Sequence, residues 1–118
     1  MLKTNTNSSG AFQSDYYSGD QRVFSDLSNR NAHTRIRTSF DMLGRVAGQR
    51  KDFPDGSSVS EFRDNVAGPY RVTRDRKGIT VMKTEDSKWL RITNNEECSQ
   101  VLSKEREIFA PPHLVECS

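Results

Sequence analysis

The chain has 118 residues, 32% of them hydrophobic, and a formal net charge of +2 at pH 7. This length allows one domain at most, and the low apolar content, with a mean hydropathy of −0.83, predicts that part of the chain is not packed. No stretch approaches the roughly 20 apolar residues of a membrane span, and the first residues lack the apolar run of a secretory signal. We therefore expect a soluble protein, in the cytoplasm or within a virion or other large assembly, with Cys98 and Cys117 reduced.

Residues 1–33 are dominated by Ser, Asn, Thr, Gly, Asp and Gln, and no helical or strand period persists among them. This composition predicts a long, extended or disordered N-terminal arm. Isolated apolar side chains in such an arm can dock in grooves of neighbouring subunits, although they are also compatible with a simple disordered tail. The candidate partner-binding residues are Phe12, Tyr16, Tyr17, Phe24 and Leu27.

Two short helices are predicted in the middle of the chain. Between His33 and Gln49, apolar residues recur every three or four positions, which favours an amphipathic helix, although the alternation from Thr34 to Phe40 also fits a strand. After a turn at residues 51–57, Ser58 and Glu61 have the spacing of a capping box. The apolar residues expected on the inward faces of these helices are Ile36, Phe40, Leu43, Val46 or Ala47, then Val59, Phe62 and Val66.

Residues 69–93 predict a three-stranded antiparallel meander, because three apolar pairs at a period of two are separated by two turn sequences. Their predicted inward face is Tyr70, Val72, Ile79, Val81, Leu90 and Ile92. Their predicted outward face is Arg71, Thr73, Thr80, Met82, Thr84, Trp89 and Arg91. The segment carries seven Lys and Arg residues against three Asp and Glu, so this small sheet is basic.

A last helix is predicted from Glu96 to Ile108, with Asn94 or Asn95 as its cap and Cys98 as a small core residue. The predicted fold is therefore α+β, a three-stranded meander packed with two or three short helices. The predicted organisation is an arm (1–33), a small α+β domain (34–110) and a C-terminal tail (111–118). Within this domain, Phe62 and Leu102 are expected to be buried.

The sequence contains no recognisable catalytic constellation. His33 and His113 have no carboxylate or metal-binding partner at a known spacing, and the glycines do not form a phosphate-binding loop. We therefore expect a protein without catalytic residues, metal or cofactor.

Two functions are predicted. The first is a non-enzymatic structural or interaction protein, oligomeric or complex-bound, whose arm docks on protein subunits of a larger assembly. The second is a small nucleic-acid-binding module that uses the basic meander, with Trp89 as a stacking surface unless that ring lies in the core. The candidate nucleic-acid-binding residues are Arg71, Arg74, Arg76, Lys77, Lys88, Trp89 and Arg91.

Overall fold

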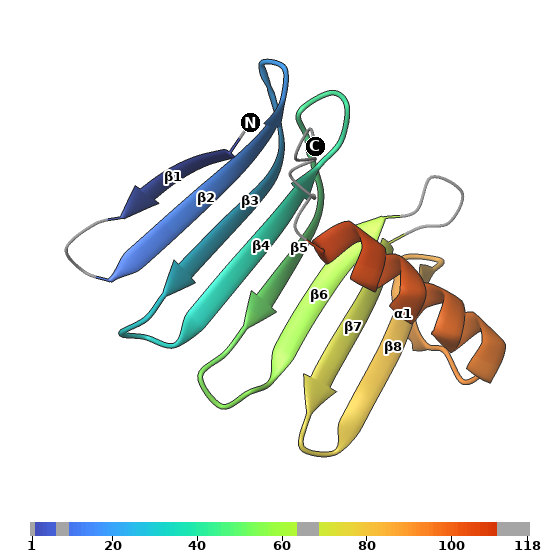
Figure 1. Ribbon diagram of the computed structural model, residues 1–118. Coiled ribbons are helices and arrows are strands. Elements are labelled where there is room, and N and C mark those ends of the chain that lie inside the picture. The colour runs from blue at the N-terminus through green and yellow to red at the C-terminus, as the bar shows by residue number, and fades with distance from the viewer. Residues whose placement is uncertain (1, 7–9, 64–68, 111–118) are drawn as a thin grey trace, which may run out of the picture.

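A computed structural model describes residues 2–6, 10–63 and 69–110. Within these ranges the chain forms one nine-stranded antiparallel sheet, in which every strand pairs with the next one in sequence, followed by one helix (Figure 1). The strands are β1 (Leu2–Thr6), β2 (Ala11–Ser18), β3 (Gln21–Asn29), β4 (Thr34–Phe40), β5 (Val46–Asp52), β6 (Ser58–Arg63), β7 (Pro69–Asp75), β8 (Gly78–Glu85) and β9 (Lys88–Arg91), and the helix is α1 (Asn95–Phe109).

The predicted α+β fold is wrong, because the chain is mostly β and its sheet is far larger than three strands. The three strands of the predicted meander are present as β7, β8 and β9, but they continue a sheet that already contains six strands. The turn between β8 and β9 has positive φ at both Asp86 and Ser87, as a two-residue hairpin requires.

The helix predicted between His33 and Gln49 is a hairpin made of β4 and β5. Asp41 closes its turn by accepting hydrogen bonds at Oδ1 from the backbone N–H groups of Leu43 and Arg45, at 2.8 and 2.9 Å. Gly44 supplies the positive φ of 78°. Leu43 is therefore a turn residue with 75% of its surface exposed, and its helical spacing from Phe40 was coincidental.

The helix predicted after Ser58 is strand β6. Its buried residues, Ser58, Ser60 and Phe62, follow a period of two, so that Phe62 is buried as predicted but in a strand. Val66, which the helical spacing also used, lies outside the described residues.

The predicted arm is also part of the sheet, since residues 11–18 and 21–29 form β2 and β3. Small polar residues alternate here with aromatic ones, and cross-strand pairing with β4 joins the segment to the rest of the fold. The described N-terminal residues therefore belong to the sheet and do not form a separate arm.

The C-terminal helix is confirmed. Asn94 caps α1 by accepting a hydrogen bond from the Glu97 N–H at 3.1 Å, and Glu96 and Glu97 lie in the positively charged first turn. Cys98 is half-buried and donates from Sγ to the Ile92 carbonyl, which agrees with its predicted packing role.

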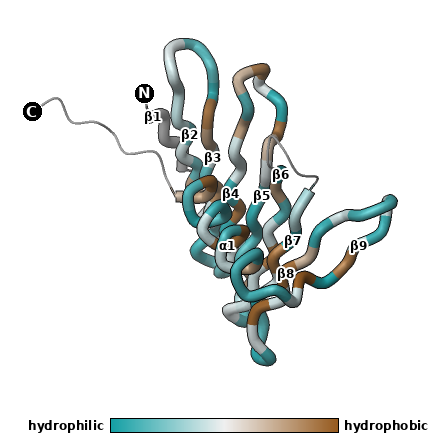
Figure 2. Tube along the Cα trace, turned by 90° about the vertical axis from the view of Figure 1, so that its right-hand side faces the viewer, coloured by the Kyte–Doolittle hydropathy of each residue, from teal (hydrophilic) through white to brown (hydrophobic). Residues whose placement is uncertain are grey.

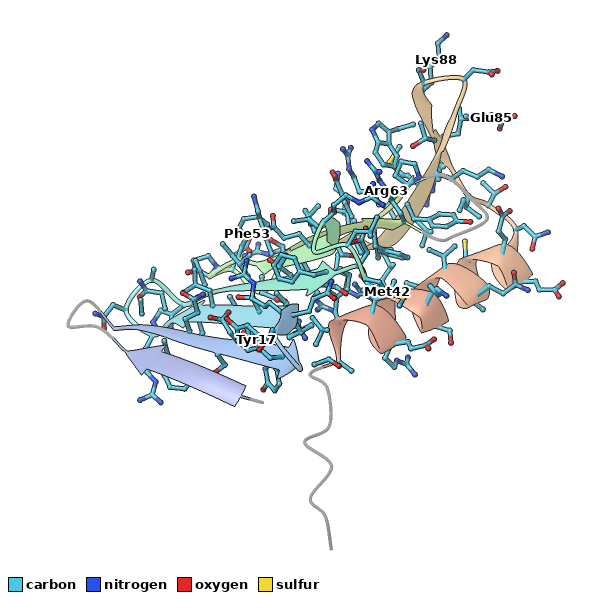
Figure 3. The ribbon with its side chains drawn as sticks, turned by 90° about the horizontal axis from the view of Figure 1, so that it is seen from above. Tyr17, Met42, Phe53, Arg63, Glu85 and Lys88 are labelled. Carbon is cyan, nitrogen blue, oxygen red and sulfur yellow. The ribbon has the colours of Figure 1, made fainter. Side chains whose placement is uncertain are left out.

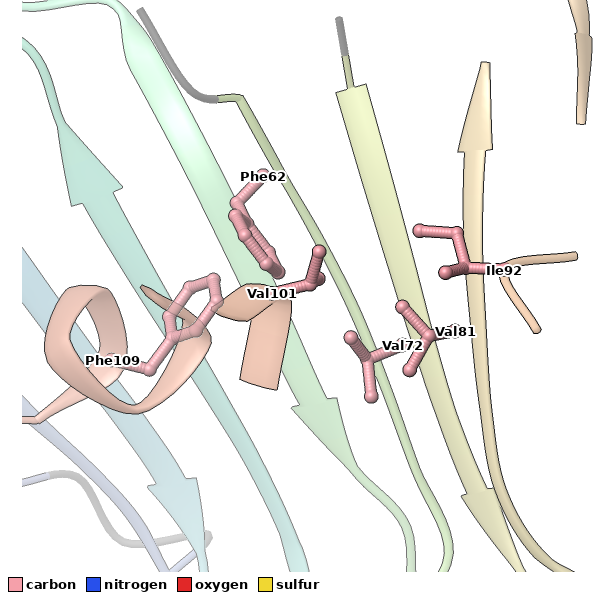
Figure 4. Close-up of a cluster of buried hydrophobic side chains, with 6 residues drawn as sticks. All are labelled: Phe62, Val72, Val81, Ile92, Val101 and Phe109. Atoms are coloured by element: carbon pink, nitrogen blue, oxygen red, sulfur yellow. The ribbon is translucent and has the colours of Figure 1, made fainter. Parts of the chain in front are cut away.

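The helix packs on one side of the sheet, which we call the helix face, and buries one cluster of apolar side chains there (Figure 4). The cluster consists of Phe62, Val72, Val81, Ile92, Val101 and Phe109, with Tyr70, Cys98, Leu102 and Ile108 partly buried against it. Of the residues predicted to face inward, Val72, Val81 and Ile92 are buried, whereas Ile79 and Leu90 are 50% and 42% exposed.

Gly48 in β5 makes room for the two aromatic rings of this core. A Cβ atom at position 48 would lie 2.7 Å from Cβ of Phe62 and 3.1 Å from Cζ of Phe109. We predict that Gly48→Ala lowers the free energy of unfolding by about 1–3 kcal/mol, because both rings would have to shift. Urea titration measures this, with Ser39→Ala at the paired position in β4 as a control that changes stability by at most about 0.5 kcal/mol. Equal effects of the two substitutions would contradict the packing argument.

Candidate functional site

The side of the sheet opposite α1, which we call the open face, is uncovered by other described elements. Because strand side chains alternate, the neighbours of buried Phe62, Val72 and Val81 point to this face. Cross-strand pairing aligns them in transverse rows, one of which runs Gln49, Glu61, Arg71, Met82 and Arg91. A second row joins Arg63, Pro69, Thr84 and Trp89, with the Thr84 hydroxyl donating to the Pro69 carbonyl at 3.2 Å.

The open face is concave near the C-terminal strands, because the β8–β9 hairpin bends away from the helix and towards this side (Figures 2 and 3). The bend brings Trp89 into one hollow of about 450 Å³ together with residues of β5 and β6, including Val46, Gln49, Glu61 and Arg63. Trp89 is half-buried and so is neither a core residue nor a fully exposed one.

Trp89 is held in place by Arg71. The guanidinium carbon of Arg71 lies 4.2 Å from the centroid of the indole ring, the geometry of a cation–π contact. Glu61 fixes Arg71 in turn, because its Oε1 accepts from Nε at 2.8 Å and lies 2.7 Å from the other guanidinium nitrogen. One face of the ring is therefore occupied by a positioned cation, and the ring borders the hollow.

The open face of β5–β9 is basic. It carries four basic side chains and two acidic ones. The basic ones are Lys51, Arg63, Arg71 and Arg91, and the acidic ones are Glu61 and Asp75. Both acidic groups are already engaged, Glu61 with Arg71 and Asp75 with the backbone N–H of Lys77 at 2.8 Å. Among the described residues, Lys51, Arg63 and Arg91 have no ion-pair partner.

On the opposite side of the sheet, the helix itself is net negative. Helix α1 carries four glutamates, Glu96, Glu97, Glu105 and Glu107, against Lys104 and Arg106. On the strands beneath the helix, Arg50, Arg74 and Lys83 are each paired with a carboxylate, from Asp52, Glu105 and Glu97. The open face differs in that three of its cations have no such partner among the described residues, which favours an anionic partner there.

Three of the seven predicted nucleic-acid-binding residues, Arg71, Trp89 and Arg91, lie on the open face. Arg76 and Lys77 instead line a separate hollow between the β5–β6 and β7–β8 turns. Lys88 lies at the far end of the β8–β9 hairpin (Figure 3).

Arg74 lies on the helix face, where it binds the buried carboxylate of Glu105, with Nη1 2.7 Å from Oε2. Ser60 also donates a hydrogen bond to this carboxylate. Burial acts to raise the pKa of Glu105, but the hydrogen bonds from Arg74 and Ser60 outweigh it, so that this pKa lies below its ordinary value. The hydrogen bond to Glu105, opposed by burial, raises the pKa of Arg74. Arg74 is therefore a structural residue.

The sequence prediction missed Gln49, Lys51 and Arg63. All three lie in segments that were expected to be a helix or a turn. It could therefore not be recognised that their side chains point to the same face of a sheet. The signal that could have identified Glu61 and Arg63 is their alternation with Ser58, Ser60 and Phe62, which is obscured because two of the buried residues are serines.

The predicted partner-binding residues of the arm are divided between the two faces. Phe12, Tyr16 and Phe24 lie on the helix face, where the Tyr16 and Phe24 rings meet edge to face with centroids 5.7 Å apart. Tyr17 and Leu27 lie on the open face, and Leu27 is 37% exposed. Phe24 is buried, so it is not available as a docking side chain.

The described residues meet neither the requirements of a metal site nor those of a membrane-spanning helix. In the described ranges, no three His, Cys, Asp or Glu side chains gather closely enough to hold a metal ion. His33 is exposed in the β3–β4 turn, and His113 lies outside the described ranges. The described part of the chain has no helix of the length and apolar character needed to cross a membrane.

Comparison with known proteins does not assign the chain to a family. The chain matches no protein-family model, no curated protein and no solved structure. The predicted virion and assembly roles therefore have no support from a relative, and the functional argument depends on the open face alone.

Proposed function

We propose that the protein is a nucleic-acid-binding module, and that a single strand lies across the open face of β5–β9. The observation that supports this proposal is the presence on one face of the only tryptophan of the chain and of three cations, Lys51, Arg63 and Arg91, that have no ion-pair partner among the described residues. Arg63 lines the same hollow as Trp89. Basic side chains that follow the backbone, together with an aromatic ring on which a base stacks, are the usual means of binding single-stranded nucleic acid.

The shape and charge of this side of the molecule favour a flexible polyanion. The β8–β9 hairpin bends towards the open face (Figure 3), and Trp89 of β9 lines one hollow with residues of β5 and β6, so that a strand can lie in the hollow with a base against the ring. On the other side, Arg50, Arg74 and Lys83 are engaged by carboxylates and the helix is net negative, which disfavours a second binding surface there.

Trp89 provides a direct test, because its fluorescence reports on this site alone. We expect a mixed-sequence single-stranded 12-mer to quench the emission at low salt, and the affinity to fall with salt by a slope of about 0.7 per phosphate contact. Arg91→Ala and Arg63→Ala should each remove about one such contact. Arg106→Ala, which removes the same charge from the helix, should leave the titration unchanged.

Failure to quench at low salt would refute the proposal. Equal weakening by Arg91→Ala and Arg106→Ala would also contradict it, since binding would then follow net charge and not the open face. The predicted docking on protein subunits relied on anchors in an N-terminal arm, which the fold incorporates as β2 and β3.

A further inference from the structure

The hollow beside Trp89 contains a hydrogen-bond acceptor with unused capacity. Both contacts of Arg71 with Glu61 are made to Oε1, and among the described residues no group donates to Oε2. Glu61 is 52% exposed at its side chain, so this oxygen is accessible to a ligand. A carboxylate can only accept hydrogen bonds, so the ligand group that meets it must be a donor.

A second acceptor lies beside the first. Gln49 is paired with Glu61 across β5 and β6 and lines the same hollow. Its Nε2 donates to the Thr38 hydroxyl at 3.2 Å, which leaves its carbonyl oxygen for a ligand. Arg63, on the other side of Glu61 along β6, supplies donors to the same hollow. The hollow thus offers acceptors next to a cationic donor.

We infer, on the basis of the proposed function, that this hollow selects a base with an exocyclic amino group and rejects thymine and uracil. A cytosine stacked on Trp89 can donate from its 4-amino group to Oε2 of Glu61, the pairing of carboxylates with cytosine seen in base recognition. Its ring nitrogen and 2-carbonyl can then accept from Arg63. Uracil has a carbonyl at position 4, which would place two acceptors against each other and leave the carboxylate unpaired.

The comparison of oligo(dC) with oligo(dU) tests this inference, because the two pyrimidines have the same size. Both 12-mers are titrated at pH 7.5 against the full chain while Trp89 fluorescence is followed. We expect oligo(dC) to bind about fivefold or more tightly than oligo(dU). In Glu61→Gln, which replaces the carboxylate by an amide of similar shape, this ratio should fall to about 1.

Asp75→Asn is the matched control, since it removes one negative charge from the same face at the far end of β7. It should strengthen binding of both oligomers equally and leave their ratio unchanged. Circular dichroism establishes that each variant is folded.

The outcomes separate the two proposals. Quenching with equal affinity for both oligomers would overturn the base selectivity and leave the proposed function standing. A ratio that persists in Glu61→Gln would also overturn it, because the discrimination would then come from another group. No quenching by either oligomer would remove the proposed function as well.

Discussion

Phe62→Ala is expected to lower the free energy of unfolding by about 3–5 kcal/mol. Phe62 is 1% exposed and meets two other rings, Tyr70 at 5.8 Å and Phe109 at 6.0 Å between centroids. The substitution removes the side chain that connects the sheet to the last turn of α1 (Figure 4), and Gly48 beside it has no side chain to fill the space. In a domain whose total stability is about 5–15 kcal/mol, this loss is large.

Urea unfolding measures the effect, and Phe53→Ala supplies the matched control. Phe53 is the same residue type in the β5–β6 turn, where it is 40% exposed, so its truncation should cost less than about 1 kcal/mol. A similar loss in both variants would show that the core is not located where α1 covers the sheet.

Arg74→Met is expected to cost about 3 kcal/mol at pH 7. The change leaves the Glu105 carboxylate, which is 1% exposed, with Ser60 as its remaining hydrogen-bond donor within the described ranges. Removing one partner of a buried ion pair typically costs about 3–5 kcal/mol, and the lower end applies because the carboxyl can take up a proton. Arg76→Met, in the exposed β7–β8 turn, removes the same charge and should change stability by at most about 0.5 kcal/mol.

The pH dependence of the unfolding free energy distinguishes the contribution of the Arg74–Glu105 ion pair from that of side-chain packing. In the native protein the pKa of Glu105 lies below its ordinary value of 4.5, so its contribution is present above that pH and is lost as the pH falls through the lowered pKa. In Arg74→Met burial dominates and the pKa rises. The difference in unfolding free energy between the two proteins should therefore shrink as the pH is lowered from 7 to 4. If the difference stays constant, the cost comes from the lost side-chain contacts and not from the ionised Glu105 carboxylate.

The C-terminal part of the fold could be predicted from sequence because its local signals agree with the tertiary structure. In β7 and β8, apolar residues at a period of two coincide with the buried positions Val72 and Val81, and the turns have residues that tolerate positive φ. The helix has a cap at Asn94 and acidic residues in its first turn, which are the electrostatic preferences of a helix start.

The N-terminal half could not be predicted, because its strands bury mainly polar atoms. Ser14 and Ser25 are buried, and Asp26 on β3 is paired with Arg35 on β4 at 2.6 Å. Residues of this kind are typical of disordered segments when they are considered one at a time. Their stabilising pairs form between neighbouring strands, and a sequence period does not reveal which positions face each other.

Only part of the candidate site could be predicted, because its remaining residues also depend on pairing between strands. Arg71, Trp89 and Arg91 follow from the alternation within the meander, but the residues that complete the hollow come from β5 and β6. Arg74 was assigned to the site by its charge, whereas the pairing of Arg74 with Ile79 places it on the helix face, beside Glu105.

The order of the strands has a consequence for how the chain folds as it is synthesised. Each strand pairs with the one made immediately before it, so the sheet can grow hairpin by hairpin and each step closes only a short loop. The apolar cluster cannot be completed in this way, because Val101 and Phe109 come from the element made last of those described. Until residues 95–109 have left the ribosome, the β6–β8 part of the sheet presents Phe62, Val72 and Val81 to solvent. This is the interval in which the nascent protein is most prone to aggregate.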